Sequence, residues 1–171
     1  GLRVGRSIVE KDHIKTVNNI LLKAKNHDCN IYLPVDVVCS NNIKDKINIK
    51  HCNVSNVLPN QMILDIGDKT IKNIINILIK SNMVLWNGPL GAFEYKPFHH
   101  GTIEILNSIK SDKIFSNIVT LAGGGDTIAA IKMAKAEKSF SYISNAGGAF
   151  LEWLEGKESP GVKALRENNL F

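Results

Sequence analysis

Cysteine is scarce in this sequence, and its pattern excludes two kinds of site. Cys29, Cys39 and Cys52 are odd in number, and their spacing matches neither a zinc site nor a set of paired disulfides. His51 and the pair His99–His100 also lack partners at ligand spacing. We therefore expect free thiols in a reducing, cytoplasmic environment and no metal held by histidine or cysteine.

Long apolar runs and blocks of like charge are missing as well. No stretch approaches the roughly 20 apolar residues that span a bilayer, and no signal peptide is visible. The net charge is +5, but the lysines are scattered, and the aromatic residues, 6% of the total, do not alternate with them. Nucleic acid and membrane are therefore disfavoured as partners, and a mild attraction for small anions is expected.

The composition is otherwise that of a folded domain, and segments of two kinds alternate along it. Apolar residues make up 44% of the 171 residues and charged residues 22%, which is typical of a globular protein. Strands are expected at 29–38, 62–67, 82–88, 117–125 and 139–144, and helices at 8–26, 70–81, 101–110, 126–137 and 149–157. This order predicts an α/β fold with an open, mainly parallel β-sheet and helices on both faces, a Rossmann-like three-layer arrangement.

Local patterns add detail to this prediction. Helix 8–26 has an apolar stripe that includes Ile14, Val17, Leu21 and Ala24. Helix 70–81 is predicted to be capped by Thr70 and to bury a stripe of four side chains, Ile71, Ile74, Ile75 and Leu78. The polar stretch 41–60 could form either a hairpin or an irregular excursion.

Three glycine-rich loops follow predicted strands, at 86–94, 122–127 and 144–150. Right-handed crossovers place all such loops at one edge of a parallel sheet, which is where ligands bind in these folds. Two familiar phosphate motifs are absent. Ile128 occupies the position of the third glycine of GxGxxG, and no GxxxxGK[ST] motif is present.

The loop GGGDT permits two interpretations. Gly123, Gly124 and Gly125 end an apolar run, and Asp126 and Thr127 follow. One interpretation is a tight turn in which Asp126 or Thr127 caps the next helix. The other is a phosphate site, in which glycine N–H groups and the positive end of the helix hold the phosphate and Asp126 reaches it through a divalent cation. The residues alone leave both open.

The other two loops offer similar choices. Gly147 and Gly148 open the next helix, and two helix N-termini at one edge could stabilise a phosphoryl group during transfer, although an ordinary turn explains them equally well. The Asn87 amide could touch a ligand, and Glu94 could accept hydrogen bonds from ribose hydroxyls. We interpret Asp36, an acid inside an apolar strand, as a hydrogen-bonded structural group, and the alternative is a catalytic carboxylate with a perturbed pKa.

Six segments in order make the combination specific. They are VGRSIVE, LPVDVV, LDIGDKT, LWNGPLGAFE, AGGGDTIAAI and SNAGGAFLEWLEGKESPGVKAL, and together they run from near Gly5 to about Leu165. This combination resembles the C-terminal, nucleotide-binding part of phosphoglycerate kinase. The resemblance implies that residues 1–171 are part of that domain, truncated at its N-terminal side. The N-terminal domain that binds 3-phosphoglycerate would then be absent, and the chain would be inactive alone.

The resemblance also implies a reaction and a set of roles. The family transfers a phosphoryl group between 1,3-bisphosphoglycerate and ADP, with Mg²⁺ and ATP/ADP as cofactors, in glycolysis. The implied nucleotide-binding residues are Asn87 near the phosphates, Glu94 on the ribose, and Gly123, Gly124, Gly125, Asp126 and Thr127 as the phosphate loop. Asp126 would hold the metal, and Gly147 and Gly148 would lie near the transferring group as catalytic residues.

The implied partners are small molecules, with no nucleic acid and no membrane, and a monomer is expected at full length. The alternative is a non-catalytic remnant, a weak Mg-nucleotide or anion-binding module that needs a partner N-terminal half. The chain departs from the family pattern at Asn145, Ala146 and Phe150, where threonine, glycine and serine are usual, and at Asp68, where proline is usual. Because Ala146 adds a Cβ, it is expected to restrict the backbone near the phosphate.

Overall fold

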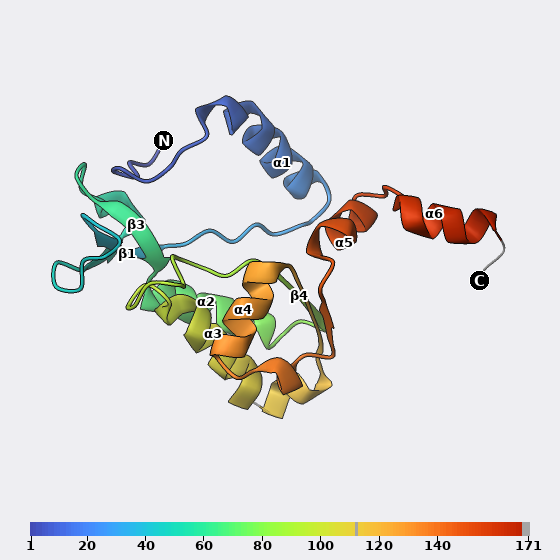
Figure 1. The fold of residues 1–171 in the computed structure, drawn as a ribbon. Helices are drawn as coiled ribbons and strands as arrows, with labels where there is room; N and C mark the ends of the chain where they lie inside the picture. Colours follow the sequence, from blue (N-terminus) through green and yellow to red (C-terminus); the bar gives the residue numbers. More distant parts are fainter. Residues whose placement is uncertain (112, 169–171) are drawn as a thin grey trace. The chain divides into compact units, whose positions relative to one another are not determined.

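The computed structural model describes residues 1–111 and 113–168 (Figure 1). By its internal contacts the chain divides into two compact units. Unit 1 comprises Gly1–Ile77 and Leu90–Ile105, and unit 2 comprises Leu78–Pro89 and the chain from Leu106 onward. None of the helices in these described ranges combines the length and the apolar character that a membrane crossing requires.

Unit 1 contains a three-stranded antiparallel sheet in the order β2-β1-β3. Its strands are β1 (Asp36–Ser40), β2 (Lys50–Asn53) and β3 (Met62–Ile66). The undecided stretch 41–60 therefore forms a hairpin with β1. The connections 41–49 and 54–61 hold no α-helix, whereas a parallel crossover needs about a dozen or more residues. This explains why the predicted parallel pairing does not extend to these strands.

The predicted strand 29–38 is regular only in its last residues. Residues 29–34 have no regular structure, and Ile31, Tyr32 and Leu33 are exposed. Pro34 lacks an N–H for a strand ladder and restricts the backbone of the residue before it, so pairing begins after it. The core of unit 1 lies on β1 and β3 in two clusters, one around Val37, Cys39 and Val57 and the other around Val38, Leu64 and Phe98.

Helix α1 (Ile14–Asn26) forms in the later part of the predicted range 8–26, while residues 8–10 are not helical and a 3-10 turn, η1 (Lys11–His13), precedes the helix. Its apolar stripe is nevertheless uncovered, because no residue of α1 is buried and Ile14, Val17 and Leu21 are exposed. A second short turn, η2 (Val54–Asn56), follows β2.

Helix α2 (Asp68–Leu78) begins two residues before the predicted cap. Thr70 is therefore the third residue of the helix and not its cap, which corrects the prediction. The acceptor for the first amides is Asp36 of β1, whose carboxylate accepts hydrogen bonds from Lys69 N–H at 3.1 Å and Thr70 N–H at 2.8 Å. In the predicted stripe Ile71 is buried, while Ile74, Ile75 and Leu78 are half-buried.

Unit 2 contains a parallel sheet in the order β4-β5-β6, which confirms the predicted α/β architecture with a parallel sheet. The strands are β4 (Met83–Asn87), β5 (Val119–Gly123) and β6 (Tyr142–Ser144). The remaining helices are α3 (His100–Ser111), η3 (Lys113–Asn117), α4 (Gly125–Met133), η4 (Glu137–Ser139), α5 (Gly147–Leu154) and α6 (Pro160–Glu167). Ala130 and Ile131 of α4 are fully buried, and α4 contacts β5.

Candidate functional site

The carboxyl ends of β4, β5 and β6 lie in one row. Asn87 pairs with Gly123 in the strand register, and Gly123 pairs with Ser144. Helix α4 begins two residues after β5 ends, and α5 begins shortly after β6. The parallel sheet of unit 2 therefore brings every predicted site residue except Glu94 to this one edge.

Glycine is required where two of the loops meet. A Cβ built on Gly147 would lie 2.5 Å from Gly124 Cα and 2.6 Å from Gly124 N, distances that no side chain tolerates. Gly124 itself has a φ of +100°, a conformation that L side chains rarely adopt. The beginning of α5 thus packs backbone against backbone on the loop before α4.

Other glycines in these loops face open space instead. A Cβ built on Gly125 or Gly148 would meet no atom within 4 Å, and both residues are exposed. The first amides of a helix have no partner within it, and they carry the positive end of the helix dipole. Two such helix beginnings, open above Gly125 and Gly148, form a surface suited to an anion.

Asp126 and Thr127 have different surroundings although they are neighbours. Asp126 is exposed in the first turn of α4. Thr127 is 1% exposed, and its Oγ1 accepts a hydrogen bond of 2.7 Å from the N–H of Gly88. The N-cap position of α4 is held by Gly124, so neither Asp126 nor Thr127 is the N-cap residue. Thr127 fixes the loop after β4, and Asp126 is available to solvent.

The loop after β4 is fixed a second time by Trp86. The Nε1 of Trp86 donates a 2.8 Å hydrogen bond to the carbonyl oxygen of Gly88, and Gly88 has a φ of +99°. Trp86 is 8% exposed and belongs to the core. Asn87, between them, is exposed at the strand end. A fixed backbone on both sides orients its amide at this edge.

Glu94 lies in unit 1, whereas the other predicted site residues lie in unit 2. It is exposed, in a loop whose backbone is attached to unit 1 at several points. The N–H of Ala92 donates to the carbonyl oxygen of Leu64 at 2.7 Å, and Leu90 is hydrogen bonded to the Thr102 hydroxyl.

The structure shows the surroundings of two residues that the sequence analysis singled out, Asp36 and Ala146. Asp36 is a structural group, as predicted: burial opposes its ionisation, but hydrogen bonds from the hydroxyl and N–H of Thr70 and from the Lys69 N–H outweigh burial and lower its pKa. Ala146 is exposed and its φ is not positive, so its Cβ needs no glycine conformation. The side chain of Phe150 lies outside the described part of the chain.

Sequence reasoning missed one buried acid, Asp65 of β3. It is 2% exposed and accepts hydrogen bonds of 2.8 Å from the N–H groups of Ile66 and Gly101. Burial raises the pKa of Asp65 to about 6 from an ordinary value of 3.8, and these hydrogen bonds offset only part of the effect. The available signal was an acid inside an apolar strand, the same signal that singled out Asp36.

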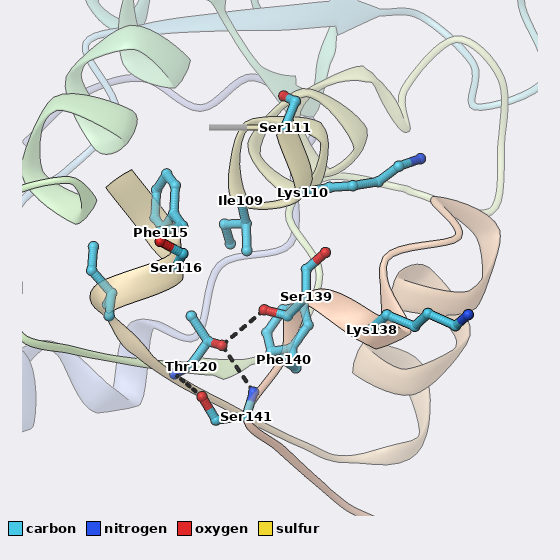
Figure 2. A pocket seen from close by; sticks show the side chains of 11 residues that line it. Ile109, Lys110, Ser111, Phe115, Ser116, Thr120, Lys138, Ser139, Phe140 and Ser141 are labelled. Atoms are coloured by element: carbon cyan, nitrogen blue, oxygen red, sulfur yellow. Dashed lines mark hydrogen bonds between the residues drawn. The ribbon is translucent and has the colours of Figure 1, made fainter. Parts of the chain in front are cut away.

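A cavity of about 410 Å³ in unit 2 lies elsewhere, near the amino end of β5 (Figure 2). Figure 2 shows Thr120 beside Ser139 and Ser141. Its hydroxyl donates to the Ser139 carbonyl oxygen at 2.9 Å and accepts from the Ser141 N–H at 3.0 Å. None of the predicted site residues lines this cavity. The hydroxyl of Thr120 is thus engaged with the neighbouring backbone.

The residues at the carboxyl edge are compatible with a magnesium ion. Within the described ranges, no group of three or more His, Cys, Asp or Glu side chains could hold a metal by itself. Mg²⁺ in phosphate sites is usually held by one or two carboxylates together with substrate phosphates and water. A single exposed carboxylate, Asp126, beside two helix N-termini fits that donor set.

Comparison with known proteins gives a consistent result. The family model described as phosphoglycerate kinase matches residues 1–157. The chain is 44% identical over 165 residues to the phosphoglycerate kinase of Zymomonas mobilis and 45% identical over 166 residues to that of Methylorubrum extorquens. It covers 42% of each of these relatives, which cover 96% and 97% of it.

Solved structures match as well. The phosphoglycerate kinase structure from Coxiella burnetii matches 98% of the chain with a TM-score of 0.90 at 31% identity. The crystal structure of phosphoglycerate kinase from Pyrococcus horikoshii matches 91% with a TM-score of 0.73 at 29% identity. The chain spans 42% and 36% of these two structures.

Proposed function

This chain belongs to the phosphoglycerate kinase family, and from that premise we propose that it supplies the magnesium–nucleotide half of a phosphoglycerate kinase site. The reaction is reversible phosphoryl transfer from 1,3-bisphosphoglycerate to ADP, giving 3-phosphoglycerate and ATP in cytoplasmic glycolysis. Residues 1–171 form part of the C-terminal nucleotide-binding domain, and an N-terminal domain binds 3-phosphoglycerate. The partners are small molecules, and the full-length enzyme is a monomer.

The observation that supports this proposal is the contact between Gly147 and Gly124. It places the beginnings of α4 and α5 side by side at the carboxyl edge of the parallel sheet. Backbone N–H groups near Gly125 and Gly148 then hold phosphate oxygens and stabilise the charge that develops during transfer.

The side chains at this edge have separate tasks. Asn87 contacts the nucleotide phosphates through its amide, and Thr127 keeps the loop after β4 in place through Gly88. Asp126 holds Mg²⁺, which neutralises charge on the phosphate oxygens. Glu94 accepts hydrogen bonds from the ribose hydroxyls. Because an acyl phosphate is a reactive donor, positioning and charge stabilisation suffice and no covalent nucleophile is needed.

Replacing Asp126 by alanine tests the phosphate and metal roles. We expect Asp126→Ala to weaken ADP binding about tenfold or more in the presence of Mg²⁺ and to leave Mg-free binding within about twofold, because only the metal-bound form uses the carboxylate. Isothermal titration calorimetry measures both affinities. Glu137→Ala, an exposed acid of η4, is the matched control and should change neither. Equal losses of ADP affinity with and without Mg²⁺ would contradict the metal role and would show that Asp126 acts only on the dipole of α4.

A second candidate function is nucleotide binding without turnover by this chain alone. It is favoured by the position of the exposed glycines Gly125 and Gly148, because the surface suited to an anion lies wholly within unit 2. A coupled phosphotransfer assay separates the two, performed with the chain alone and after adding a separately produced N-terminal half of a relative. Activity that needs the added half supports the kinase role, and inactivity in both assays together with retained MgADP binding supports the module.

A further inference from the structure

A buried carboxylate lies under the loop that carries Glu94. We call residues 90–101 the Glu94 loop. At its end, the N–H of Gly101 donates a 2.8 Å hydrogen bond to Asp65 Oδ2, and the other carboxylate oxygen accepts from the Ile66 N–H at 2.8 Å. Asp65 is 2% exposed, so both bonds are shielded from water. A hydrogen bond shielded from water in this way fixes the loop end, because breaking it would leave a buried acceptor unsatisfied.

The beginning of the Glu94 loop contacts the same carboxylate. A Cβ built on Gly91 would lie 2.5 Å from Asp65 Oδ1, and one built on Gly101 would lie 2.6 Å from that oxygen. Gly91 also has a φ of +67°. Both ends of the loop therefore approach one buried side chain so closely that only glycine fits at either point.

Two further attachments leave little freedom to the rest of the loop. The Thr102 hydroxyl accepts from the Leu90 N–H and donates to the Leu90 carbonyl oxygen, both at 2.7 Å. Phe98 is fully buried, in a cluster with Val38 and Leu64. Glu94, midway between these attachments, is exposed. Its position thus depends on anchors at the two ends of the loop.

We propose that Asp65 is a positioning residue for nucleotide recognition: by holding Gly91 and Gly101 it sets the position of Glu94 for the ribose hydroxyls. The inference rests on the ribose role of Glu94 in the proposed function. Asp65 itself touches no substrate. Its carboxylate acts through the backbone of the Glu94 loop.

The titratable groups that act on Asp65 are two histidines at the end of the Glu94 loop. His99 and His100 lie at the end of the loop and the start of α3, and His100 Nε2 lies 3.4 Å from Asp68 Oδ1 of α2. The paired residue on β1 is Val38, which carries no charge. Opening the loop would return Asp65 to water and its pKa toward 3.8. Protonation therefore favours the closed loop, and opening becomes more frequent as pH rises from about 4 to about 6.

The test combines loop exchange with ribose recognition in four variants: Asp65→Ala, Asp65→Asn, Glu94→Gln and Asp45→Asn. Asp45 is a half-buried acid of a turn in unit 1, distant in sequence from the Glu94 loop, and serves as the control. Hydrogen exchange detected by mass spectrometry reports the protection of residues 90–101. Titrations with MgADP and with magnesium 2′,3′-dideoxy-ADP give an affinity ratio that reports the ribose hydroxyls alone, and magnesium pyrophosphate reports the phosphate site.

We expect Asp65→Ala to lower protection of the Glu94 loop about tenfold or more and to bring the affinity ratio to that of Glu94→Gln. Asp65→Asn keeps one acceptor oxygen and should restore part of the protection and of the ratio. In the wild-type chain, the difference between the Asp65 pKa in the closed and in the open loop predicts that opening increases on the order of a hundredfold between about pH 4 and pH 6. Asp65→Asn should not show this increase. Pyrophosphate binding and the Asp45→Asn control should stay unchanged.

The outcomes separate this inference from the proposed function. If Asp65→Ala and Asp65→Asn keep wild-type protection and the wild-type ratio, the positioning role is wrong while the proposed function stands. If the wild-type chain binds pyrophosphate but does not distinguish the two nucleotides, the ribose role of Glu94 fails, and the positioning role fails with it. If neither the wild-type chain nor any of the variants binds magnesium pyrophosphate, the proposed function itself is contradicted. Should Asp65→Ala not fold, the pH profile of Asp65→Asn decides.

Discussion

Asp126 and Asp65 both lie beside backbone N–H groups, but their surroundings assign them opposite tasks. Asp126 is exposed at the start of α4, where a ligand can approach it. Asp65 is 2% exposed and its two oxygens already accept backbone hydrogen bonds. In the proposed site the first shares an ion with a phosphate, and the second holds the chain around it.

The buried acid should give the fold a measurable dependence on pH. Because the pKa of Asp65 is raised to about 6, the native state binds this proton more tightly than the unfolded state does. Its contribution to stability is therefore greatest below about pH 4 and is lost as pH rises through about 6, by about 3 kcal/mol at most. Urea unfolding between those pH values measures the change in the free energy of unfolding.

Asp65→Asn isolates this contribution from that of other acids. Asp36, whose pKa is lowered, contributes in the opposite direction: its stabilisation is present above its ordinary pKa and is lost as pH falls below it. The difference between wild type and Asp65→Asn should therefore vary with pH between about 4 and 6. A constant difference would show that Asp65 is not perturbed by burial.

At the scale of elements, the two glycines that open α5 provide a matched pair. Gly147→Ala places a Cβ 2.5 Å from Gly124 Cα, so the two loops must separate. We expect a loss of about 2 kcal/mol in the free energy of unfolding and much weaker MgADP binding. Gly148→Ala meets no atom within 4 Å and should stabilise the helix by up to about 1 kcal/mol. Equal behaviour of the two variants in urea unfolding would contradict the contact between the loops.

The sequence predicts the three strands of unit 2 and its helices α4 and α5 well, because each is a local pattern, but it does not predict α6. The apolar run 117–122, its glycines and the following helix correspond to β5 and α4 within a few residues. The antiparallel pairing of the strands in unit 1 depends on the lengths of their connections and on Pro34. The apolar periodicity of the sequence contains no information on either. The cap of α2 was also missed, because its acceptor, Asp36, lies on another strand.

The candidate site was predictable for a different reason. Glycines before helices at the ends of parallel strands meet at one edge whatever their separation in sequence, and the register of Asn87, Gly123 and Ser144 shows this. The sequence could not show that Thr127 is buried against Gly88, nor that Asp65 lies under the Glu94 loop. Both are contacts between segments distant in sequence.

For the whole molecule, family membership and fold are established, and the chain spans 42% of the curated relatives it matches. The apolar stripe of α1 illustrates what a sequence pattern leaves open. Its periodicity predicts the helix and the face, but in the described structure no residue of α1 is buried. A pattern shows that a face is suited to burial and says nothing of what covers it.

The central claim is that the carboxyl edge of β4, β5 and β6 binds the metal–nucleotide phosphates. Nuclear magnetic resonance of the ¹⁵N-labelled chain with MnADP tests it directly, because Mn²⁺ replaces Mg²⁺ and broadens the signals of nearby amides. We predict that the amide signals of residues 123–127 and 147–148 broaden first, and that those of residues 138–141, at the cavity near the amino end of β5, persist. Broadening at 138–141 with the glycine loops unaffected would contradict the account.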